Sequence, residues 1–467
     1  MTTPITAEAP AQSDAGWLLR KVLQEPGKRP ATAAAAIASD SSVRLPVATF
    51  FPARPNSFDA LDIRSRDLES MILRLLLQRN GQPGAGISET LKIQFRLIEP
   101  LLKSLREQRL LEIRQSVGSH DYEYLLTEKG LAQARQESSR CAYCEAAPVS
   151  YRDYVRSVEM QSPSRAKLTS DSLKKALGDL SIHPQLLSRL GRAITGGRAM
   201  FLCGPPGNGK TSIAERMVGS YTDSIWIPYA VSFGGEIVRL FDPLVHHPVA
   251  QDGSVGNAAD ERWVRIRRPA VIAGGELDLD ATFFRVDAQS KLMQPPLHLK
   301  SNGGVLIIDD FGRQRVRPNE LLNRWIVPLE SRVDYLPLPS GRSFRVPFEQ
   351  FLVLSTNLKP TELVDEAYLR RIPYKIEVEG PTTDEFVRRL RCSAEQLQLT
   401  FASDEVIARL LEVHFLQTKR SIRFCHARDL LVLVQHQCEF HGLPPVITHE
   451  LLDEAVATYF FAGEAEA

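Results

Sequence analysis

The stretch GPPGNGKT at residues 204–211 has the residue types and the spacing to hold the phosphates of a nucleotide. Its glycines allow backbone N–H groups to turn toward phosphate oxygens at the start of a helix, where the helix terminus favours negative charge. Lys210 would neutralise the β- and γ-phosphates, and the Thr211 hydroxyl would bind Mg²⁺. The residues predicted to hold the nucleotide are Gly204, Pro205, Pro206, Gly207, Asn208, Gly209, Lys210, Thr211 and Ser212.

Two aspartates farther along the chain could supply the rest of a hydrolytic site. Four apolar residues run directly into Asp309 and Asp310 in the segment VLIIDD. Asp309 is placed to hold magnesium, and Asp310 to orient the attacking water. The second acid of such a pair is commonly glutamate. Aspartate carries the same charge with one methylene less reach, so we expect an active site and leave its rate open.

The elements that must position these side chains are short buried strands. Residues 199–203, 305–308 and 351–355 are almost entirely apolar, and they lead into the glycine-rich loop, the aspartate pair and Asn357 respectively. The Asn357 amide could contact both the γ-phosphate and the attacking water. A helix is expected from Ser212 onward. Each element alone is a weak signal, whereas their order and spacing together are a strong one.

From about residue 170 onward, the chain resembles an AAA+ ATPase. GPPGNGKT is similar to the Walker A motif of that family, VLIIDD to Walker B, and STN, with Asn357, to sensor 1. DEAYLRRI resembles the arginine-finger segment, which would place Arg371, or its neighbour Arg370, against the ATP of the next subunit. IRFCHARDLLVLV resembles the sensor 2 helix, with Arg428 as the candidate and Arg423 as the alternative.

The resemblance implies an α/β fold, a P-loop NTPase core with a parallel sheet and a C-terminal helical lid. It also implies ATP and Mg²⁺ as cofactors, hydrolysis of ATP to ADP and phosphate, and assembly into a ring, expected to be a hexamer. The apolar–turn–apolar segment at residues 333–348 is expected to form a hairpin. A hairpin before sensor 1 resembles the clade of MoxR-like chaperones and sigma-54 activators, where it lines the pore or contacts the remodelled partner. A purely structural hairpin is the alternative.

The region before the ATPase motifs resembles a winged helix. Helical spacing of apolar residues predicts a first helix around Leu68–Leu75, and further helices are expected from Ser88 and from Pro100. Residues 110–113 and 122–126 read as two strands joined by a turn. Three helices followed by a hairpin give an α+β module.

The charges of this module leave two partners open. Lys103, Arg106 and Arg109 could contact nucleic-acid phosphates, but Glu99 and Glu107 lie on the same predicted helix. Winged helices also serve as protein-docking modules. Nucleic acid is therefore one expected partner of this region and protein the other.

Composition and these resemblances divide the chain into five regions. The predicted regions are a flexible arm at 1–58, a winged-helix-like domain at 59–140, a linker at 141–180, an AAA+ α/β core at 181–380 and a helical lid at 381–467. A cluster of arginines in the core, Arg262, Arg265, Arg267 and Arg268, could bind a neighbour, a nucleic acid or nothing specific.

Whole-chain properties exclude several classes of protein. The net charge of +1 over 467 residues gives no argument for a nucleic-acid or acidic-membrane partner of the whole chain. The six cysteines do not form a framework of disulfides, and no apolar run approaches the ~20 residues needed to cross a bilayer. A cytoplasmic protein without membrane insertion is expected.

Three functions fit these observations. The leading one is a remodelling or chaperone-like ATPase that works as a ring on an unknown protein substrate. The second is a DNA-associated regulator or helicase-loader-like ATPase that uses the winged helix. The third is an assembly scaffold that is gated by ATP and hydrolyses it only weakly.

Overall fold

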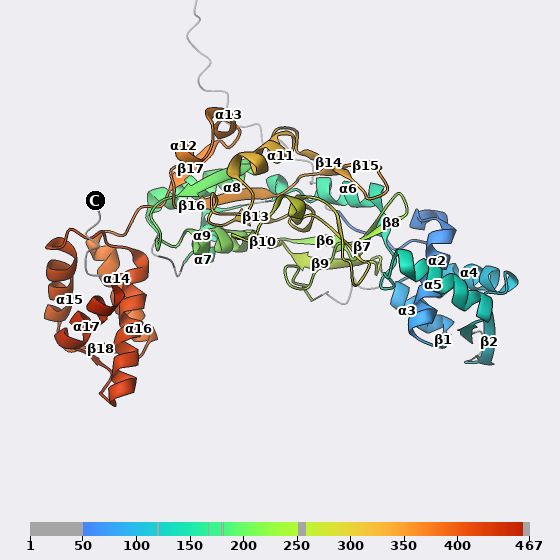
Figure 1. Ribbon diagram of the computed structural model, residues 1–467, viewed down its shortest axis with the longest axis horizontal. Helices are drawn as coiled ribbons and strands as arrows, with labels where there is room; N and C mark the ends of the chain where they lie inside the picture. The colour runs from blue at the N-terminus through green and yellow to red at the C-terminus, as the bar shows by residue number, and fades with distance from the viewer. Residues whose placement is uncertain are drawn as a thin grey trace, which may run out of the picture. The chain divides into compact units, whose positions relative to one another are not determined.

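The computed structural model describes residues 50–118, 121–166, 168–178, 180, 182–250 and 258–460 (Figure 1). Residues 1–49 of the predicted N-terminal arm lie outside the described residues. From Phe50 the chain packs on the folded part: the Phe50 ring lies 5.1 Å from the Trp263 ring, and Ala53 forms a bridge with Ala259. The described residues from Phe50 to Phe58, which were predicted to belong to the arm, are therefore part of this packed region.

The first helices and strands follow the predicted order. They are α2 (Ser65–Gln78), α3 (Gly84–Leu91), α4 (Phe95–Glu107), β2 (Leu111–Ser116) and β3 (Tyr122–Leu126). The helix after them, α5 (Glu128–Arg140), was not predicted. A two-residue strand, β1 (Gln82–Pro83), completes a small sheet in the order β1-β3-β2. The helices bury one apolar stripe each around a common core, as their amphipathic spacing predicts.

Two helix starts in this region differ from the prediction. Helix α3 begins at Gly84 rather than Ser88, because the carboxylate of Asp121 accepts hydrogen bonds from the N–H groups of Gly84 and Ala85 at 2.9 Å each. That cap comes from a distant part of the chain, so local patterns do not reveal it. Helix α4 begins before Pro100, which lies inside it.

Residues 141–180 were predicted as a linker but contain regular structure that joins the core. This stretch contains β4 (Val149–Ser150), α6 (Tyr151–Met160) and α7 (Ser170–Ala176). Strand β4 pairs in parallel with β7 (Ala230–Phe233). A two-residue strand has no detectable alternation of its own, so the sequence alone did not indicate it.

The central sheet is five-stranded and entirely parallel, as predicted. Its strands, in spatial order, are β10 (Ala270–Ala273), β13 (Val305–Ile308), β16 (Phe351–Thr356), β5 (Ala199–Cys203) and β17 (Tyr374–Glu377). The middle strands β13 and β16 are buried at every position, which explains their continuous apolar runs. The predicted α/β fold with a parallel sheet is thus confirmed. The glycine-rich loop follows β5, the first strand of this sheet along the chain.

Helices cover both faces of this sheet and make two separate hydrophobic cores. One face packs on α7, α8 (Pro184–Gly196) and α9 (Lys210–Met217), through residues such as Leu190 and Ile213. The other face packs on α11 (Pro318–Ser331), whose Trp325 is fully buried. Alternate residues of β13 belong to the two cores, so the strand is fixed from both sides.

A second five-stranded sheet was not predicted. Its order is β11 (Arg285–Val286), β12 (Met293–Gln294), β8 (Glu236–Arg239), β7 and β4. Two further strands, β6 (Ser224–Pro228) and β9 (Trp263–Arg267), form an antiparallel ribbon. The predicted hairpin is present as β14 (Val333–Pro337) and β15 (Ser343–Pro347). Its inner side packs on the second sheet, where the Phe344 ring lies 5.5 Å from the Phe233 ring.

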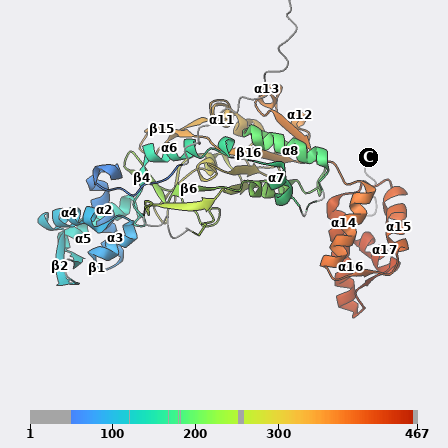
Figure 2. The ribbon, with the colours of Figure 1, turned by 180° about the vertical axis from the view of Figure 1, so that it is seen from behind.

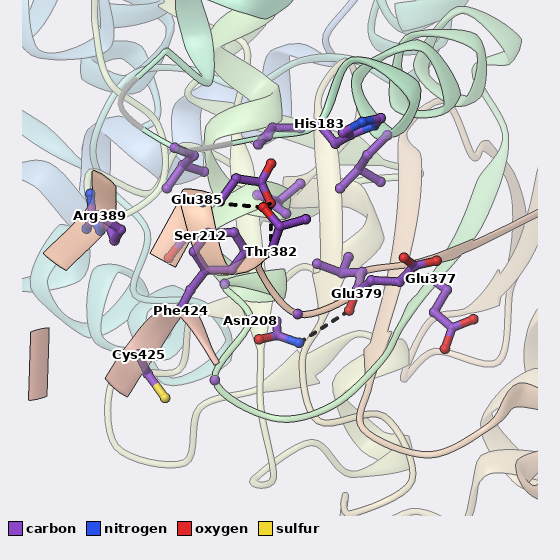
Figure 3. Close-up of a pocket in the computed structure, with 18 of the residues that line it drawn as sticks. His183, Asn208, Ser212, Glu377, Glu379, Thr382, Glu385, Arg389, Phe424 and Cys425 are labelled. Carbon is purple, nitrogen blue, oxygen red and sulfur yellow. Dashed lines mark hydrogen bonds between the residues drawn. The ribbon is translucent and has the colours of Figure 1, made fainter. Parts of the chain in front are cut away.

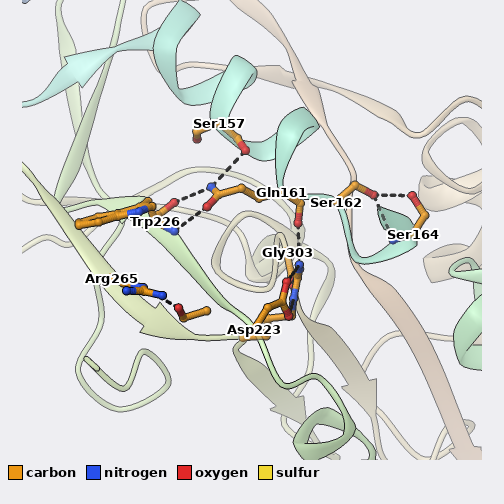
Figure 4. Close-up of polar contacts among 10 residues, drawn as sticks. Ser157, Gln161, Ser162, Ser164, Asp223, Trp226, Arg265 and Gly303 are labelled. Carbon is orange, nitrogen blue, oxygen red and sulfur yellow. Dashed lines mark hydrogen bonds and ion pairs between the residues drawn. The ribbon is translucent and has the colours of Figure 1, made fainter. Parts of the chain in front are cut away.

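Three of the four clustered arginines have internal partners. The buried Arg262 pairs with Asp260 at 2.7 Å, and Arg265 donates to the Ser224 hydroxyl. Arg268 is also buried and pairs with Asp223 at 2.6 Å. Figure 4 shows this region, including the contacts of Asp223 and Arg265. The cluster is therefore structural, and only Arg267 is exposed.

The C-terminal part is helical, as expected (Figure 2). Its elements are α14 (Thr383–Gln396), α15 (Asp404–Arg409), a π-helical segment (Leu410–Leu416), α16 (Phe424–His441) and α17 (His449–Tyr459). Thr382 and Glu385 form a capping box at the start of α14. Within the ranges that the structure describes, no helix has the length and apolar character needed to cross a membrane.

Candidate functional site

Three neighbouring strands of the central sheet end at the candidate site. Strand β5 leads into the glycine-rich loop, β13 into Asp309 and Asp310, and β16 into Asn357. These strands are adjacent and parallel, in the order β13-β16-β5. Because the carboxyl ends of parallel strands lie at one edge of a sheet, motif residues that are 47 to 147 positions apart in sequence meet there.

The glycine-rich loop requires glycine at two positions for reasons visible in its contacts. Gly204 has φ +138, and a Cβ added there would lie 2.4 Å from the Val378 carbonyl oxygen. Gly207 has φ +80, and an added Cβ would lie 2.4 Å from the Cys425 sulfur. Both the left-handed backbone and the lack of space exclude a side chain. The loop then opens directly into α9, which begins at Lys210.

Thr211 and Asp309 come together in the way that a magnesium site needs. The Thr211 hydroxyl donates a hydrogen bond to Asp309 Oδ2 at 2.8 Å. A hydroxyl and a carboxylate are the hard oxygen ligands that Mg²⁺ uses, usually together with water and substrate phosphates. The two predicted metal ligands therefore fit the ion in donor type and in proximity.

Lys210 lies at the centre of the site. Its Nζ donates to the Gly204 and Pro205 carbonyl oxygens at 3.0 and 2.9 Å and to Asn357 Oδ1 at 2.6 Å. Burial lowers the pKa of the Lys210 ammonium, while the nearby charges of Asp309 and Asp310 act in the opposite direction. The two carboxylates thus favour the charged form that would bind phosphate.

Asp310 has an unusual backbone conformation. Its φ is 48°, in the left-handed region, and its exposed carboxylate accepts a hydrogen bond from Asn357 Nδ2 at 3.1 Å. This region costs an ordinary L-residue about 1–2 kcal/mol, and aspartate and asparagine enter it more readily than other non-glycine residues. The conformation gives a physical reason for aspartate, rather than the commoner glutamate, at this position.

A cavity of about 440 Å³ adjoins the glycine-rich loop (Figure 3). Asn208 and Ser212 line it from the loop and α9, His183 from the start of α8, and Phe424 from the start of α16. The N–H of Cys425 donates to the Gly207 carbonyl at 3.0 Å, so the lid helix contacts the loop directly. The cavity is amphipathic, which suits the base and sugar of a nucleotide.

The two predicted sensor 2 candidates both lie near this cavity. Arg428 is exposed and lines it. Arg423 is half-buried, and its positive charge contributes to lowering the pKa of Lys210. Both candidates, Arg428 and the alternative Arg423, therefore lie near the nucleotide-sized cavity and the glycine-rich loop.

The two predicted arginine-finger candidates differ in their surroundings. Arg371 is held within its own subunit, because its Nε donates to Glu330 at 2.5 Å and its Nη1 to the Ala367 carbonyl at 2.7 Å. Arg370 is exposed, and no hydrogen bond or ion pair of its side chain is found among the described residues. Of the two, Arg370 has the side chain that is free to reach another molecule.

Some residues of the site had no signal in the sequence. His183 lies outside the recognised motifs, and Phe424 lies within the segment that resembles the sensor 2 helix but was not one of its candidate residues. Only the folding of α8 and α16 against the loop brings these two side chains to the cavity. Gln314, which follows the aspartate pair, bonds to the backbone on both sides of the turn. A half-buried glutamine in a polar segment has no pattern that distinguishes it from a solvated one.

The C-terminal helices match a family model, and larger parts of the chain are similar to solved structures at low sequence identity. Residues 382–458 match a family described as a domain of unknown function (DUF8689), which covers α14 to α17. No curated protein sequence matches the chain. Among solved structures, the Thermotoga maritima RuvB Holliday junction branch migration motor is 14% identical over 62% of this chain and 70% of that chain, with a TM-score of 0.33.

A second solved structure is similar to the same low degree. NtrX from Brucella abortus, in complex with ADP, is 14% identical over 73% of this chain and 69% of that chain, with a TM-score of 0.38.

Proposed function

We propose that the chain binds ATP with Mg²⁺ and hydrolyses it to ADP and phosphate, as an ATPase of the AAA+ type. The observation that carries this proposal is the hydrogen-bonded series Lys210–Asn357–Asp310 beside the Thr211–Asp309 pair. These side chains come from three different strand ends, and a purely structural role does not require a lysine, an amide and two carboxylates to converge there.

Each residue has a role that follows from its position. Lys210 binds the β- and γ-phosphates, and Thr211 and Asp309 hold the metal ion. Bound Mg²⁺ neutralises charge that develops on the transferred phosphate group. Asp310 orients the attacking water, and Asn357 fixes Asp310 while contacting the γ-phosphate. Hydrolysis needs in-line positioning and charge stabilisation more than covalent chemistry, and this set supplies both.

The direct test is phosphate release by the purified full chain, with ATP and Mg²⁺ at several protein concentrations. Lys210→Ala should lose ATP binding and turnover together, because the cation that binds the phosphates is gone. Asp310→Asn should bind ATP and lose turnover. A wild-type chain that releases no phosphate at any concentration would overturn the proposal.

We further propose that the active form is an assembly of several copies that acts on a protein partner. Arg370 is exposed and lies in the segment that resembles the arginine finger of the family. A finger in trans makes hydrolysis depend on assembly, so the specific activity should rise with protein concentration. Ring formation, a hexamer by resemblance, is measured by light scattering with and without ATP.

The N-terminal module at residues 59–140, which we propose is winged-helix-like, fits a protein partner better than nucleic acid. The exposed side of α4 carries Arg96, Lys103 and Arg106 but also Glu99 and Glu107. A phosphate-binding surface needs one sign of charge, whereas these charges alternate along the helix. A gel shift with steep salt dependence would instead favour the DNA-associated regulator.

A further inference from the structure

Gln314 closes the turn that presents Asp310. After β13 the backbone turns sharply, with φ of 48° at Asp310 and 108° at Gly312. The half-buried Gln314 spans this turn: its Nε2 donates to the Asp309 carbonyl at 2.6 Å, and its Oε1 accepts from the Gly312 N–H at 2.8 Å. The carbonyl only accepts and the N–H only donates, so the orientation of the Gln314 amide is determined by its partners.

The bond to the Asp309 carbonyl bears directly on the conformation of Asp310. That carbonyl belongs to the planar peptide group that joins Asp309 to Asp310. Rotation about φ of Asp310 turns this peptide group relative to the Asp310 side chain. When Gln314 holds the carbonyl, it therefore favours the left-handed φ and fixes the direction in which the Asp310 carboxylate points.

The other side of the turn is held by β16. The N–H of Phe311 donates to the Ser355 carbonyl at 2.7 Å, and the Thr356 hydroxyl donates to the Phe311 carbonyl at 2.8 Å. Gln314 adds a second restraint from within the turn, beside the hydrogen bond from the Arg313 N–H to the Asp310 carbonyl at 2.9 Å. Among the described residues, the Gln314 side chain forms its hydrogen bonds with the backbone of the turn and not with the Asp310 carboxylate.

We propose that Gln314 is a positioning residue for ATP hydrolysis, which acts by holding the Asp309–Asp310 peptide so that the Asp310 carboxylate faces the attacking water. This inference rests on the proposed function. It predicts an effect on turnover with little effect on nucleotide binding, since Gln314 is not among the described residues that line the cavity and its hydrogen bonds are to Asp309 and Gly312.

The test replaces Gln314 with methionine, which has similar length and makes neither hydrogen bond. Gln314→Met should lower kcat by roughly 10- to 100-fold, the loss expected from misplacing a catalytic group by about 1 Å. The Kd for a fluorescent ATP analogue should stay within about twofold of wild type, and the melting temperature shows whether the variant is folded. Gln289→Met, at an exposed site, serves as the matched control.

Two further variants separate positioning from general disruption. In Gln314→Glu the carboxylate still accepts from Gly312 but donates to the Asp309 carbonyl only when protonated. Its kcat should therefore fall about as far as that of Gln314→Met, because an ionised carboxylate also lacks the bond to the Asp309 carbonyl. In an Asp310→Glu background, which should keep measurable turnover, Gln314→Met should lower kcat little further, because both changes displace the same carboxylate.

The outcomes distinguish the two proposals. No hydrolysis by the wild-type chain would overturn the ATPase and this inference together. Wild-type hydrolysis with an unchanged kcat for Gln314→Met would overturn the inference alone, as would equal losses in kcat and in ATP affinity or a wild-type kcat for Gln314→Glu.

Discussion

Asn357 donates a hydrogen bond from Nδ2 to the carboxylate of Asp310 at 3.1 Å. The other end of the same amide accepts from Lys210 at 2.6 Å, so one side chain connects the glycine-rich loop to the second aspartate. The amide orientation is fixed, because the ammonium only donates and the carboxylate only accepts. A phosphate that binds Lys210 would therefore alter the surroundings of Asp310 through Asn357.

The length of residue 310 is predicted to matter as much as its charge. Asp310→Glu should lower kcat rather than raise it, because glutamate enters the left-handed region less readily and its extra methylene crowds Asn357. We expect a loss of roughly tenfold in kcat, with ATP affinity retained. Steady-state phosphate release and nucleotide titration measure the two effects. A faster Asp310→Glu enzyme would show that reach, and not backbone conformation, limits this site.

Removing the Thr211 hydroxyl should weaken the binding of Mg²⁺ that supports hydrolysis. Thr211→Ala removes one of the two predicted metal ligands and leaves Asp309. The Mg²⁺ concentration for half-maximal hydrolysis should therefore rise by roughly 10- to 100-fold. Thr211→Ser keeps the hydroxyl and is the matched control. Titration of activity with Mg²⁺ at saturating ATP measures the shift. Equal magnesium dependence in all three chains would remove Thr211 from the metal site.

The two adjacent arginines should behave differently. Arg370→Ala should abolish turnover and spare ATP binding, because its exposed side chain is the one able to reach a neighbouring site. Arg371→Ala loses the ion pair with Glu330, an interaction worth less than about 1 kcal/mol at a partly exposed site. Its turnover should fall only slightly. A larger loss for Arg371→Ala than for Arg370→Ala would reverse the assignment.

Mixing two inactive chains tests whether the finger acts between subunits. Lys210→Ala retains Arg370, and Arg370→Ala retains Lys210, so an interface between the two variants contains one complete site. An equal mixture should recover up to about a quarter of wild-type activity, the fraction of such interfaces in a randomly mixed ring. A mixture as inactive as its components would place the arginine outside the partner's site.

The meeting of these motifs at one edge of the sheet was predictable because each motif follows a buried strand. Lys210, Asp310 and Asn357 lie at the ends of β5, β13 and β16, whose apolar runs identify them as buried strands. Adjacent parallel strands bring their ends together whatever the length of chain between them. The left-handed backbone of Asp310 was not predictable, because it depends on hydrogen bonds from Gln314 and from strand β16.

The second sheet shows where sequence patterns fail. Its strands β4, β11 and β12 have two residues each, too few for an alternating pattern. The arginine run at residues 262–268 was equally ambiguous, because charge alone does not reveal that Arg268 pairs with Asp223 forty-five positions earlier. In both cases the determining contacts are between distant segments of the chain.

A last prediction concerns acid stability. His246 is buried, its Nδ1 accepts from the Asp242 N–H at 2.9 Å, and its Nε2 lies 2.9 Å from the Lys300 carbonyl. Burial lowers the pKa of His246 to about 4, against about 6.5 in an unfolded chain. Between these values the unfolded state binds more protons, so stability falls as the pH drops from about 6.5 to about 4, by up to about 3 kcal/mol.

The measurement is the melting temperature as a function of pH, with two variants. His246→Gln removes this titration and should flatten the fall below about pH 6.5. It should not abolish the fall, because burial also lowers the pKa of His298. His247→Gln, at the exposed neighbouring position, should leave the wild-type pH dependence intact. If His246→Gln and wild type lose stability in parallel as the pH falls, the acid sensitivity has another origin.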